Sequence, residues 1–207
     1  MKLKRCFYTK KLIFLFFVPF IILFITSPAF SYPVEFTDSQ GNNITINDRP
    51  SHVLSLVPSI TEIIFKIGAG DAVKAITYHD TYPSEAATKE IVGGFFSPSL
   101  KAIESIQPNV IFYSHFHKNI KDKFGHGKCQ LINLETDSMA DSYNNIRILG
   151  RIFNKEDEAK KVIYRIKNEL QIITKKVARI PQPKRKGGFI LANSRQYCYI
   201  KNPGFLN

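Results

Sequence analysis

The feature that most limits how this chain can fold is the regular alternation of short apolar runs with short segments of helical spacing. Apolar runs that predict buried strands lie at residues 52–56, 73–77, 110–113 and 129–134. Segments that predict helices lie at residues 60–67, 84–87, 100–106 and 118–124. Because strands that alternate with helices form βαβ units, we expect an α/β fold with a parallel sheet covered on both faces.

The segments on either side of this alternation have different patterns. Residues 34–37 and 43–46 alternate apolar and polar side chains around a turn at 38–41, which predicts a β-hairpin. After the last strand, helical spacing runs from Ser138 to Leu149, and Gly150 is expected to break that helix. The order of the elements is therefore a hairpin, a βα region and a helical region.

A second and longer helix is predicted from Asn154 to about Ala178. Asn154 is its expected N-cap, because the acidic residues 156–158 follow and would lie near the positive end of the helix dipole. Its apolar positions form one stripe: Ala159, Val162, Ile163, Ile166, Leu170, Ile173 and Val177. Some 24 residues at about 1.5 Å each give about 36 Å, long enough to cross a whole domain.

The first 31 residues have the composition of a secretory leader. Basic residues precede an apolar run from Leu12 to Ile25, and Ala29 and Ser31 provide the small residues of a cleavage site. The apolar run is about 14 residues long, shorter than the roughly 20 that a membrane-spanning helix needs. We therefore expect a cleaved signal peptide and a periplasmic protein; the alternative is an uncleaved leader that anchors the chain in the membrane.

The net charge and the cysteine content bear on two questions: whether the chain binds nucleic acid and whether it is cross-linked by disulfides. The net charge is +12, part of it in the leader and much of the rest on helix faces. Because an exported chain does not meet nucleic acid, we interpret this charge as solvated helix surface rather than a nucleic-acid site. Outside the leader, Cys129 and Cys198 are the cysteines, and two so distant in sequence do not form a disulfide framework. Unpaired thiols are expected, with a single bond between them as the alternative.

Three histidines follow two of the predicted strands. His79 follows the strand at 73–77, and His115 and His117 follow the strand at 110–113. Open α/β sheets bind ligands at the carboxyl edge of their strands, where these side chains are expected. Three imidazoles at one edge would hold a transition metal or a haem iron. Histidines on solvated loops are the alternative.

Two adjacent aromatic residues, Phe95 and Phe96, precede a helix that Ser99 is expected to cap. Because neighbouring residues of an extended segment point in opposite directions, one of the two rings is expected to face a ligand cleft. Catalytic motifs for nucleophiles or phosphates are absent from the sequence, so an enzyme is not expected. An exported metal-dependent hydrolase built on His115 and His117 is the alternative, although the acidic residue that such a site needs does not follow the pair.

Three stretches resemble the class III periplasmic substrate-binding proteins of ABC importers, which carry siderophores, haem and cobalamin. These stretches are SLVPSITEIIFKIGAGDAVKAITYHDTYPSEA, VGGFFSPSLKAIESIQPNVIFYS and RILGRIFNKEDEAKKVI, and the resemblance runs from about Ser51 to the end of the chain. It implies two α/β lobes joined by one long crossing helix, with the ligand between the lobes. It also implies that the chain acts with an inner-membrane permease, as a monomer and without a cofactor of its own.

Carried over by residue, the resemblance implies ligand contacts from the loops after the strands. These residues are Pro58, Ser59, Tyr78, His79, Phe95, Phe96, Ser114 and His115. Cobalamin-type members have a Glu at the start of the following helix that docks on the permease. This chain departs from that pattern: Lys101 stands at the position of the Glu, which weakens the docking contact, and Glu104 lies one turn later.

The resemblance also implies how the chain is divided. Its expected parts are a signal peptide at 1–31, an α/β lobe at 32–137, a helical connector at 138–180 and the start of a second lobe at 181–207. A complete second lobe would need on the order of a hundred further residues. We therefore expect a truncated product that binds its iron-siderophore, haem or corrinoid poorly. The alternative function is a carrier of bare Zn or Mn, held by His79, His115 and His117.

Overall fold

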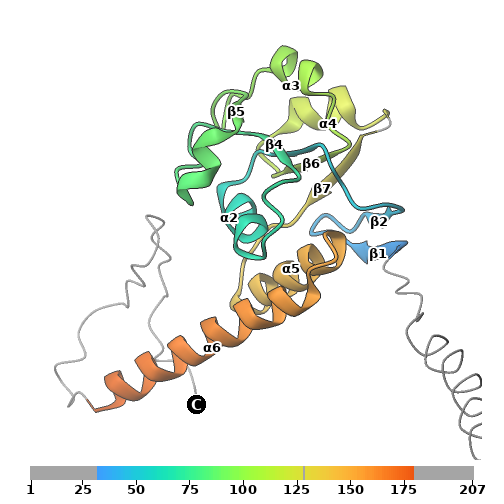
Figure 1. Cartoon of the computed structure of the whole chain (residues 1–207). Helices are drawn as coiled ribbons and strands as arrows, with labels where there is room; N and C mark the ends of the chain where they lie inside the picture. Colours follow the sequence, from blue (N-terminus) through green and yellow to red (C-terminus); the bar gives the residue numbers. More distant parts are fainter. Residues whose placement is uncertain (1–31, 128, 180–207) are drawn as a thin grey trace, which may run out of the picture. The chain divides into compact units, whose positions relative to one another are not determined.

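A computed structural model describes residues 32–127 and 129–179 of the 207-residue chain. Its main element is a parallel five-stranded sheet with the order β5-β4-β3-β6-β7 (Figure 1). The strands are β3 (Val53–Ser55), β4 (Val73–Ile76), β5 (Glu90–Ile91), β6 (Val110–Tyr113) and β7 (Gln130–Asn133). The predicted α/β fold with a parallel sheet is confirmed. The edge strand β5 was not predicted, because two exposed residues have no recognisable periodicity.

Helices follow the strands along the chain. They are α2 (Pro58–Lys66), the 3-10 helix η1 (Ser84–Thr88), α3 (Leu100–Ile106), α4 (Lys118–Phe124), α5 (Met139–Ile152) and α6 (Glu156–Ala178). The Ser99 side chain accepts a hydrogen bond from the Ala102 N–H and caps α3, as the sequence predicted. None of the helices in residues 32–127 and 129–179 is long and apolar enough to cross a membrane.

The sheet has a separate apolar core on each face. Because successive strand residues point to opposite faces, Val110 and Phe112 lie in one core, and Ile111 and Tyr113 lie in the other. Helices α2, α5 and the start of α6 cover the first face, with buried residues that include Ile64, Leu149 and Val162. Helices α3 and α4 cover the second face through Ile103 and Ile120.

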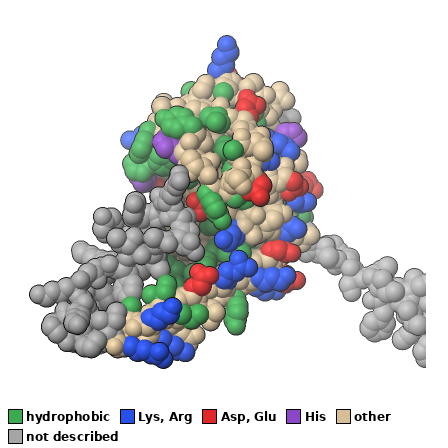
Figure 2. All heavy atoms as spheres, turned by 60° about the vertical axis from the view of Figure 1, so that its left-hand side comes forward, with side chains coloured by type: hydrophobic (Ala, Val, Ile, Leu, Met, Phe, Trp, Pro, Cys, Tyr) green, Lys and Arg blue, Asp and Glu red, His purple; other side chains and the backbone are tan. Residues whose placement is uncertain are grey.

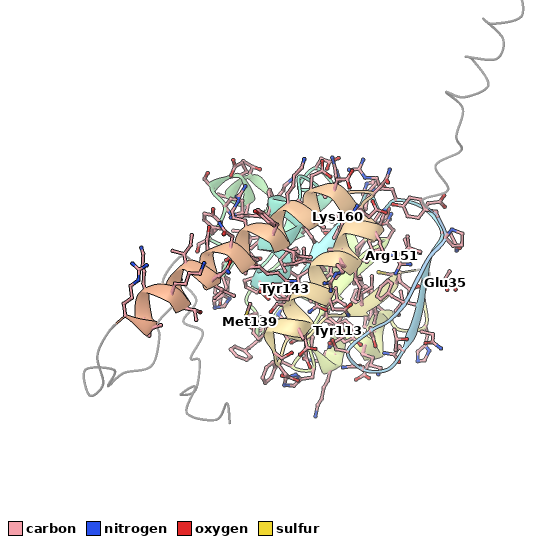
Figure 3. The ribbon with its side chains drawn as sticks, turned by 90° about the horizontal axis from the view of Figure 1, so that it is seen from below. Glu35, Tyr113, Met139, Tyr143, Arg151 and Lys160 are labelled. Carbon is pink, nitrogen blue, oxygen red and sulfur yellow. The ribbon has the colours of Figure 1, made fainter. Side chains whose placement is uncertain are left out.

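The predicted hairpin forms from β1 (Val34–Thr37) and β2 (Asn43–Ile46), paired antiparallel. It packs beside α5, where the Arg151 side chain donates a 3.0 Å hydrogen bond to the carbonyl oxygen of Glu35 (Figure 3). At the same end of α5, the Tyr32 hydroxyl donates to the carbonyl oxygen of Ile152 at 2.6 Å. The hairpin is thus attached to the lobe through backbone acceptors as well as through its apolar residues.

The junction between α5 and α6 differs from the prediction at two residues. Gly150 does not break α5, which continues to Ile152. A Cβ at Gly150 would lie 2.7 Å from the Cβ of Ala159, so this glycine allows close packing of α5 on α6. Asn154 does not cap α6 but has φ +53°, the left-handed conformation that ends a helix, and Lys155 is the N-cap. Both Gly150 and Asn154 are residue types that can end a helix. Spacing in the sequence therefore did not show that α5 continues past Gly150 and that the chain turns at Asn154.

Helix α6 is buried at its beginning and more exposed toward its end. Ala159, Val162 and Ile163 are buried in the core of the first face, whereas Leu170, Ile173 and Val177 of the same stripe are only partly covered. The predicted leader at 1–31, the strand at 188–192 and Cys198 lie outside the described residues. Cys129 has no disulfide partner within residues 32–127 and 129–179, and burial raises the pKa of its thiol to about 12.

Candidate ligand site

The loops that follow the parallel strands bring aromatic and histidine side chains to the carboxyl edge of the sheet. Tyr78 and His79 follow β4, residues 95–96 follow β5, residues 114–117 follow β6, and Glu135 follows β7. All five strands point in the same direction, so these loops share one edge. The edge argument from the sequence placed His79, His115 and His117 at this edge, which is where they lie.

Five of these side chains form what we call the aromatic cluster: Phe95, Phe96, His115, Phe116 and His117. The centroid of the Phe95 ring lies 4.8 Å from that of Phe96 and 5.8 Å from that of Phe116, in edge-to-face geometry. Phe96 and Phe116 are 5.5 Å apart in the same geometry. Phe95 is half-buried, but Phe96 is 74% exposed and Phe116 is 55% exposed. The cluster therefore presents two large apolar rings to solvent.

The surface around the cluster is hollowed. A hollow of about 410 Å³ is lined by Phe96, Pro98, Leu100, Phe116 and the beginning of α4. In the space-filling view, hydrophobic and histidine side chains lie next to one another on the upper part of the surface (Figure 2). A larger hollow of about 740 Å³ lies elsewhere, with walls of mixed charge that include Arg49, Glu62, Lys89 and Lys155. The smaller hollow is the one that combines aromatic rings with the carboxyl edge.

Two glycines allow the loop after β5 to turn back on itself. Gly93 has φ +115°, and a Cβ there would lie 2.9 Å from the carbonyl oxygen of Ser97. Gly94 lies beneath Tyr78, whose hydroxyl oxygen would overlap with a Cβ on Gly94. The Tyr78 N–H donates to the carbonyl oxygen of Gly93 at 3.0 Å. The loops that carry Tyr78 and Phe95 are therefore in direct contact.

Asp80 is buried beneath the turn that carries Tyr78 and His79. Its Oδ2 accepts hydrogen bonds from the N–H of Thr77 at 3.0 Å and from the Thr77 hydroxyl at 2.5 Å. Burial raises the pKa of Asp80, although the hydrogen bonds from Thr77 act in the opposite direction. Its Oδ1 has no hydrogen-bond partner among the described residues. Asp80 thus holds the turn through one of its two carboxylate oxygens.

Both ring nitrogens of His117 are occupied by the backbone. Its Nδ1 accepts a hydrogen bond from the Ser114 N–H at 3.0 Å, so its Nε2 carries the proton that it shares with the carbonyl oxygen of Phe95. Burial lowers the pKa of His117, opposed by the bond to Phe95, and the ring is neutral at pH 7. His117 links the loops after β5 and β6, and Ser114 is buried and supports it.

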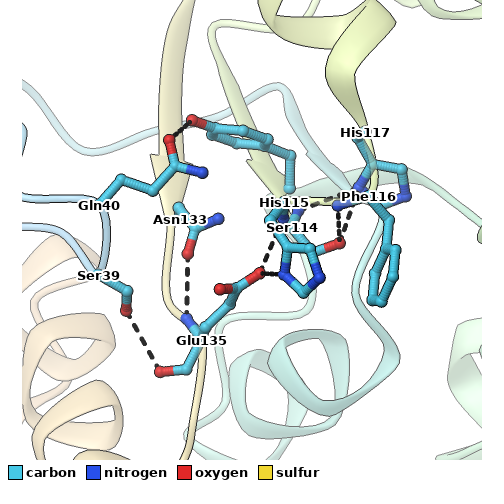
Figure 4. Close-up of polar contacts among 9 residues, drawn as sticks. Ser39, Gln40, Ser114, His115, Phe116, His117, Asn133 and Glu135 are labelled. Atoms are coloured by element: carbon cyan, nitrogen blue, oxygen red, sulfur yellow. Dashed lines mark hydrogen bonds and ion pairs between the residues drawn. The ribbon is translucent and has the colours of Figure 1, made fainter.

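His115 is paired with a carboxylate. The Glu135 Oε1 accepts a 2.8 Å hydrogen bond from the His115 N–H and is also bonded to the His115 Nδ1 (Figure 4). Partial burial raises the pKa of Glu135, but these bonds from His115 outweigh it and the pKa lies below its usual value. His79 has a different partner, because its Nδ1 accepts a 3.1 Å hydrogen bond from the Phe95 N–H.

The remaining predicted residues lie at or near the same edge. Pro58 and Ser59 begin α2, which is separated from β3 by two residues, and Pro58 is half-buried whereas Ser59 is exposed. Lys101 is exposed on α3, and Glu104 one turn later forms a 2.8 Å ion pair with Lys123 of α4. Within residues 32–127 and 129–179, no group of three or more His, Cys, Asp or Glu side chains is placed to hold a metal ion. The structure does not bring His79, His115 and His117 together as such a group.

Two residues of the site were missed in the sequence. Phe116 lies between His115 and His117. The sequence around it does not show whether its ring is exposed or buried. Glu135 follows the last strand of the sheet by two residues. The rule that placed His79 and His115 at the carboxyl edge applies equally to Glu135, so position after a strand was the signal that could have found it.

Comparison with known proteins matches this chain to substrate-binding proteins. The sequence model of a family described as "Periplasmic binding protein" matches residues 53–206. A Bacillus subtilis protein named "Uncharacterized ABC transporter substrate-binding lipoprotein YvrC" is 28% identical over 167 residues, which is 77% of this chain and 52% of that protein. A vitamin B12-binding protein of Vibrio parahaemolyticus is 25% identical over 138 residues, which is 65% of this chain and 50% of the relative. The chain spans about half the length of these relatives.

Solved structures agree on the fold. The iron-uptake substrate-binding protein PiuA of Streptococcus pneumoniae superposes with a TM-score of 0.63 at 18% identity, covering 72% of this chain and 54% of PiuA. The haem-binding protein HmuT superposes with a TM-score of 0.62 at 24% identity, covering 76% of this chain and 52% of HmuT. At these sequence identities the similarity shows a shared fold and does not identify a ligand.

Proposed function

This chain belongs to the periplasmic binding protein family, and from that premise we propose that it is the substrate-binding component of an ABC importer. Its ligand would be a bulky metal chelate of the iron-siderophore, haem or cobalamin type. It would be exported by its N-terminal leader and would deliver the chelate to a permease in the inner membrane. Relatives and structural neighbours named for vitamin B12, haem and a siderophore support this class of ligand.

The observation that carries the proposal is the exposed aromatic cluster at the carboxyl edge of the sheet. Phe96 and Phe116 present their rings to solvent at 74% and 55% exposure. Large exposed rings grouped in a hollow mark a binding surface, because a ligand that covers them removes apolar area from water. A porphyrin, a corrin or a set of catechol rings has the flat face that packs on such rings at about 4.5–7 Å between centroids.

The geometry favours a chelate over a bare metal ion. A metal carrier needs three or four converging donors, and the ring nitrogens of His117 are both engaged with the backbone. The His79 Nδ1 is also engaged, with the Phe95 N–H. These bonds hold loops together instead of leaving lone pairs free for an ion. The same rings and loops provide a face that a macrocycle can cover.

A panel of ligands tests the proposal. Isothermal titration of the purified chain with ferric haem, cyanocobalamin, a ferric tricatecholate and zinc chloride should show saturable binding of at least one chelate. We expect a Kd in the micromolar range or weaker, which corresponds to a binding free energy no more favourable than about −8 kcal/mol. The reason is that the described residues contact only one side of a ligand placed on the cluster. Binding of zinc with no binding of any chelate would contradict the proposal.

A further inference from the structure

The three histidines at the carboxyl edge differ in which ring nitrogen is available. In His117 and His79 the Nδ1 accepts a backbone N–H, so the proton of the neutral ring lies on Nε2. In His115 the Nδ1 faces the Glu135 carboxylate, which only accepts hydrogen bonds when ionised, so the proton lies on Nδ1. His115 is therefore the one of the three whose Nε2 has a free lone pair.

The His115 ring is held in place from two sides. Glu135 Oε1 accepts bonds from both the backbone N–H and the Nδ1 of His115. The Phe116 ring packs on the imidazole, with 3.9 Å between centroids and 39° between the planes. The His115 side chain is nevertheless 58% exposed, and its Nε2 has no hydrogen-bond partner among the described residues. The available lone pair thus has a defined direction beside the aromatic cluster.

The backbone of Glu135 is held by three different elements. Its N–H donates to the Asn133 Oδ1 at 3.2 Å, at the end of β7. Its carbonyl oxygen accepts a 3.2 Å bond from the Ser39 hydroxyl in the turn of the β1–β2 hairpin (Figure 4). The same oxygen accepts a 3.3 Å bond from the Asn145 Nδ2 of α5. Hairpin, strand and helix together fix the residue that orients His115.

We infer that Glu135 is a positioning residue that fixes the tautomer and direction of the His115 imidazole, so that His115 Nε2 coordinates the metal of a chelate with an open coordination position. The inference rests on the proposed function and selects among its ligands. An imidazole that donates its second N–H to a carboxylate is a better and more directed metal ligand. A hexadentate ferric siderophore has no open position for His115 to fill, whereas ferric haem has an axial one.

Two porphyrins, ferric haem and metal-free protoporphyrin IX, test the inference. Bound to the unaltered chain, ferric haem should show the absorption spectrum of imidazole-coordinated iron. His115→Ala should abolish that spectrum, and Glu135→Ala should weaken haem binding by about 10- to 100-fold. Glu135→Gln should restore most of the affinity, because the amide oxygen still accepts from Nδ1. Affinity for metal-free protoporphyrin IX should be the same for the unaltered chain and both Glu135 variants, which a general structural defect would not allow.

Matched controls come from the same chain. His126→Ala replaces another exposed histidine, and Glu169→Ala replaces an exposed glutamate of α6; neither should change the haem spectrum. An unchanged spectrum in His115→Ala, or equal losses of haem and protoporphyrin affinity in Glu135→Ala, would overturn the inference. A chain that binds neither porphyrin would also overturn the inference. If that chain binds the ferric tricatecholate or cyanocobalamin, the proposed function is still supported.

Discussion

Replacing Phe96 and Phe116 together by alanine is expected to weaken binding of the preferred chelate by about 1,000-fold, since truncating a buried aromatic anchor costs about 2 kcal/mol. Phe96 and Phe116 are the exposed rings of the cluster, at 74% and 55% exposure, and they lie in contact with one another. The loss arises because the variant removes apolar area that the ligand would cover. Isothermal titration with the best ligand of the panel measures it.

Tyr164→Ala is the matched control for this double variant. Tyr164 lies on α6, away from the strand ends, and is 74% exposed, the same fraction as Phe96. A ligand that binds the aromatic cluster should have unchanged affinity for this control. If the control weakens binding as much as the double variant, or if the double variant retains full affinity, the cluster is not the binding surface.

Phe112→Ala is expected to give the largest loss of stability, about 3–5 kcal/mol in the free energy of unfolding. Phe112 is fully buried in β6, between β3 and β7, and its ring lies 6.4 Å from that of Phe153. Its removal leaves a cavity between the sheet and α5, two residues before Ser114 and three before His115. Urea denaturation followed by circular dichroism measures the change in the midpoint.

Phe112→Leu keeps the measurement possible if the alanine variant does not fold, and it should lose a smaller part of the stability. Phe96→Ala is the surface control, because the same change at an exposed ring is expected to alter stability by about 0.5 kcal/mol at most. Equal midpoints for Phe112→Ala and Phe96→Ala would show that the core of the lobe does not depend on Phe112.

Periodicity predicted the lobe well, because burial on both faces of a parallel sheet leaves a direct trace in the sequence. Four apolar runs match four of the five strands, and the spacing of residues 60–67 and 100–106 matches α2 and α3. The fifth strand, β5, left no such trace because both of its residues are exposed at the sheet edge. Gly150 and Asn154 were placed wrongly, since contact with Ala159 and a left-handed φ are properties of the packed helix pair.

The sequence predicted where the residues of the candidate site lie and did not predict what each of them does. Position after a strand indicated where His79 and His115 would lie. It could not indicate which ring nitrogen of a histidine is occupied, because that depends on bonds between different loops, such as His117 to Phe95. Nor could it indicate that Ser114 is buried or that Glu135 faces His115. These facts depend on tertiary contacts between segments that are distant in sequence.

The central claim is that the aromatic cluster binds the chelate, and paramagnetic broadening tests it most directly. Ferric haem and a ferric tricatecholate carry unpaired electrons that broaden the NMR signals of nearby nuclei, with an effect that falls steeply with distance. We predict that substoichiometric ligand broadens the amide signals of residues 94–96 and 114–117 and leaves those of residues 160–170 in α6 sharp. Broadening centred on Arg49, Lys89 and Lys155, which line the larger hollow, would contradict the claim.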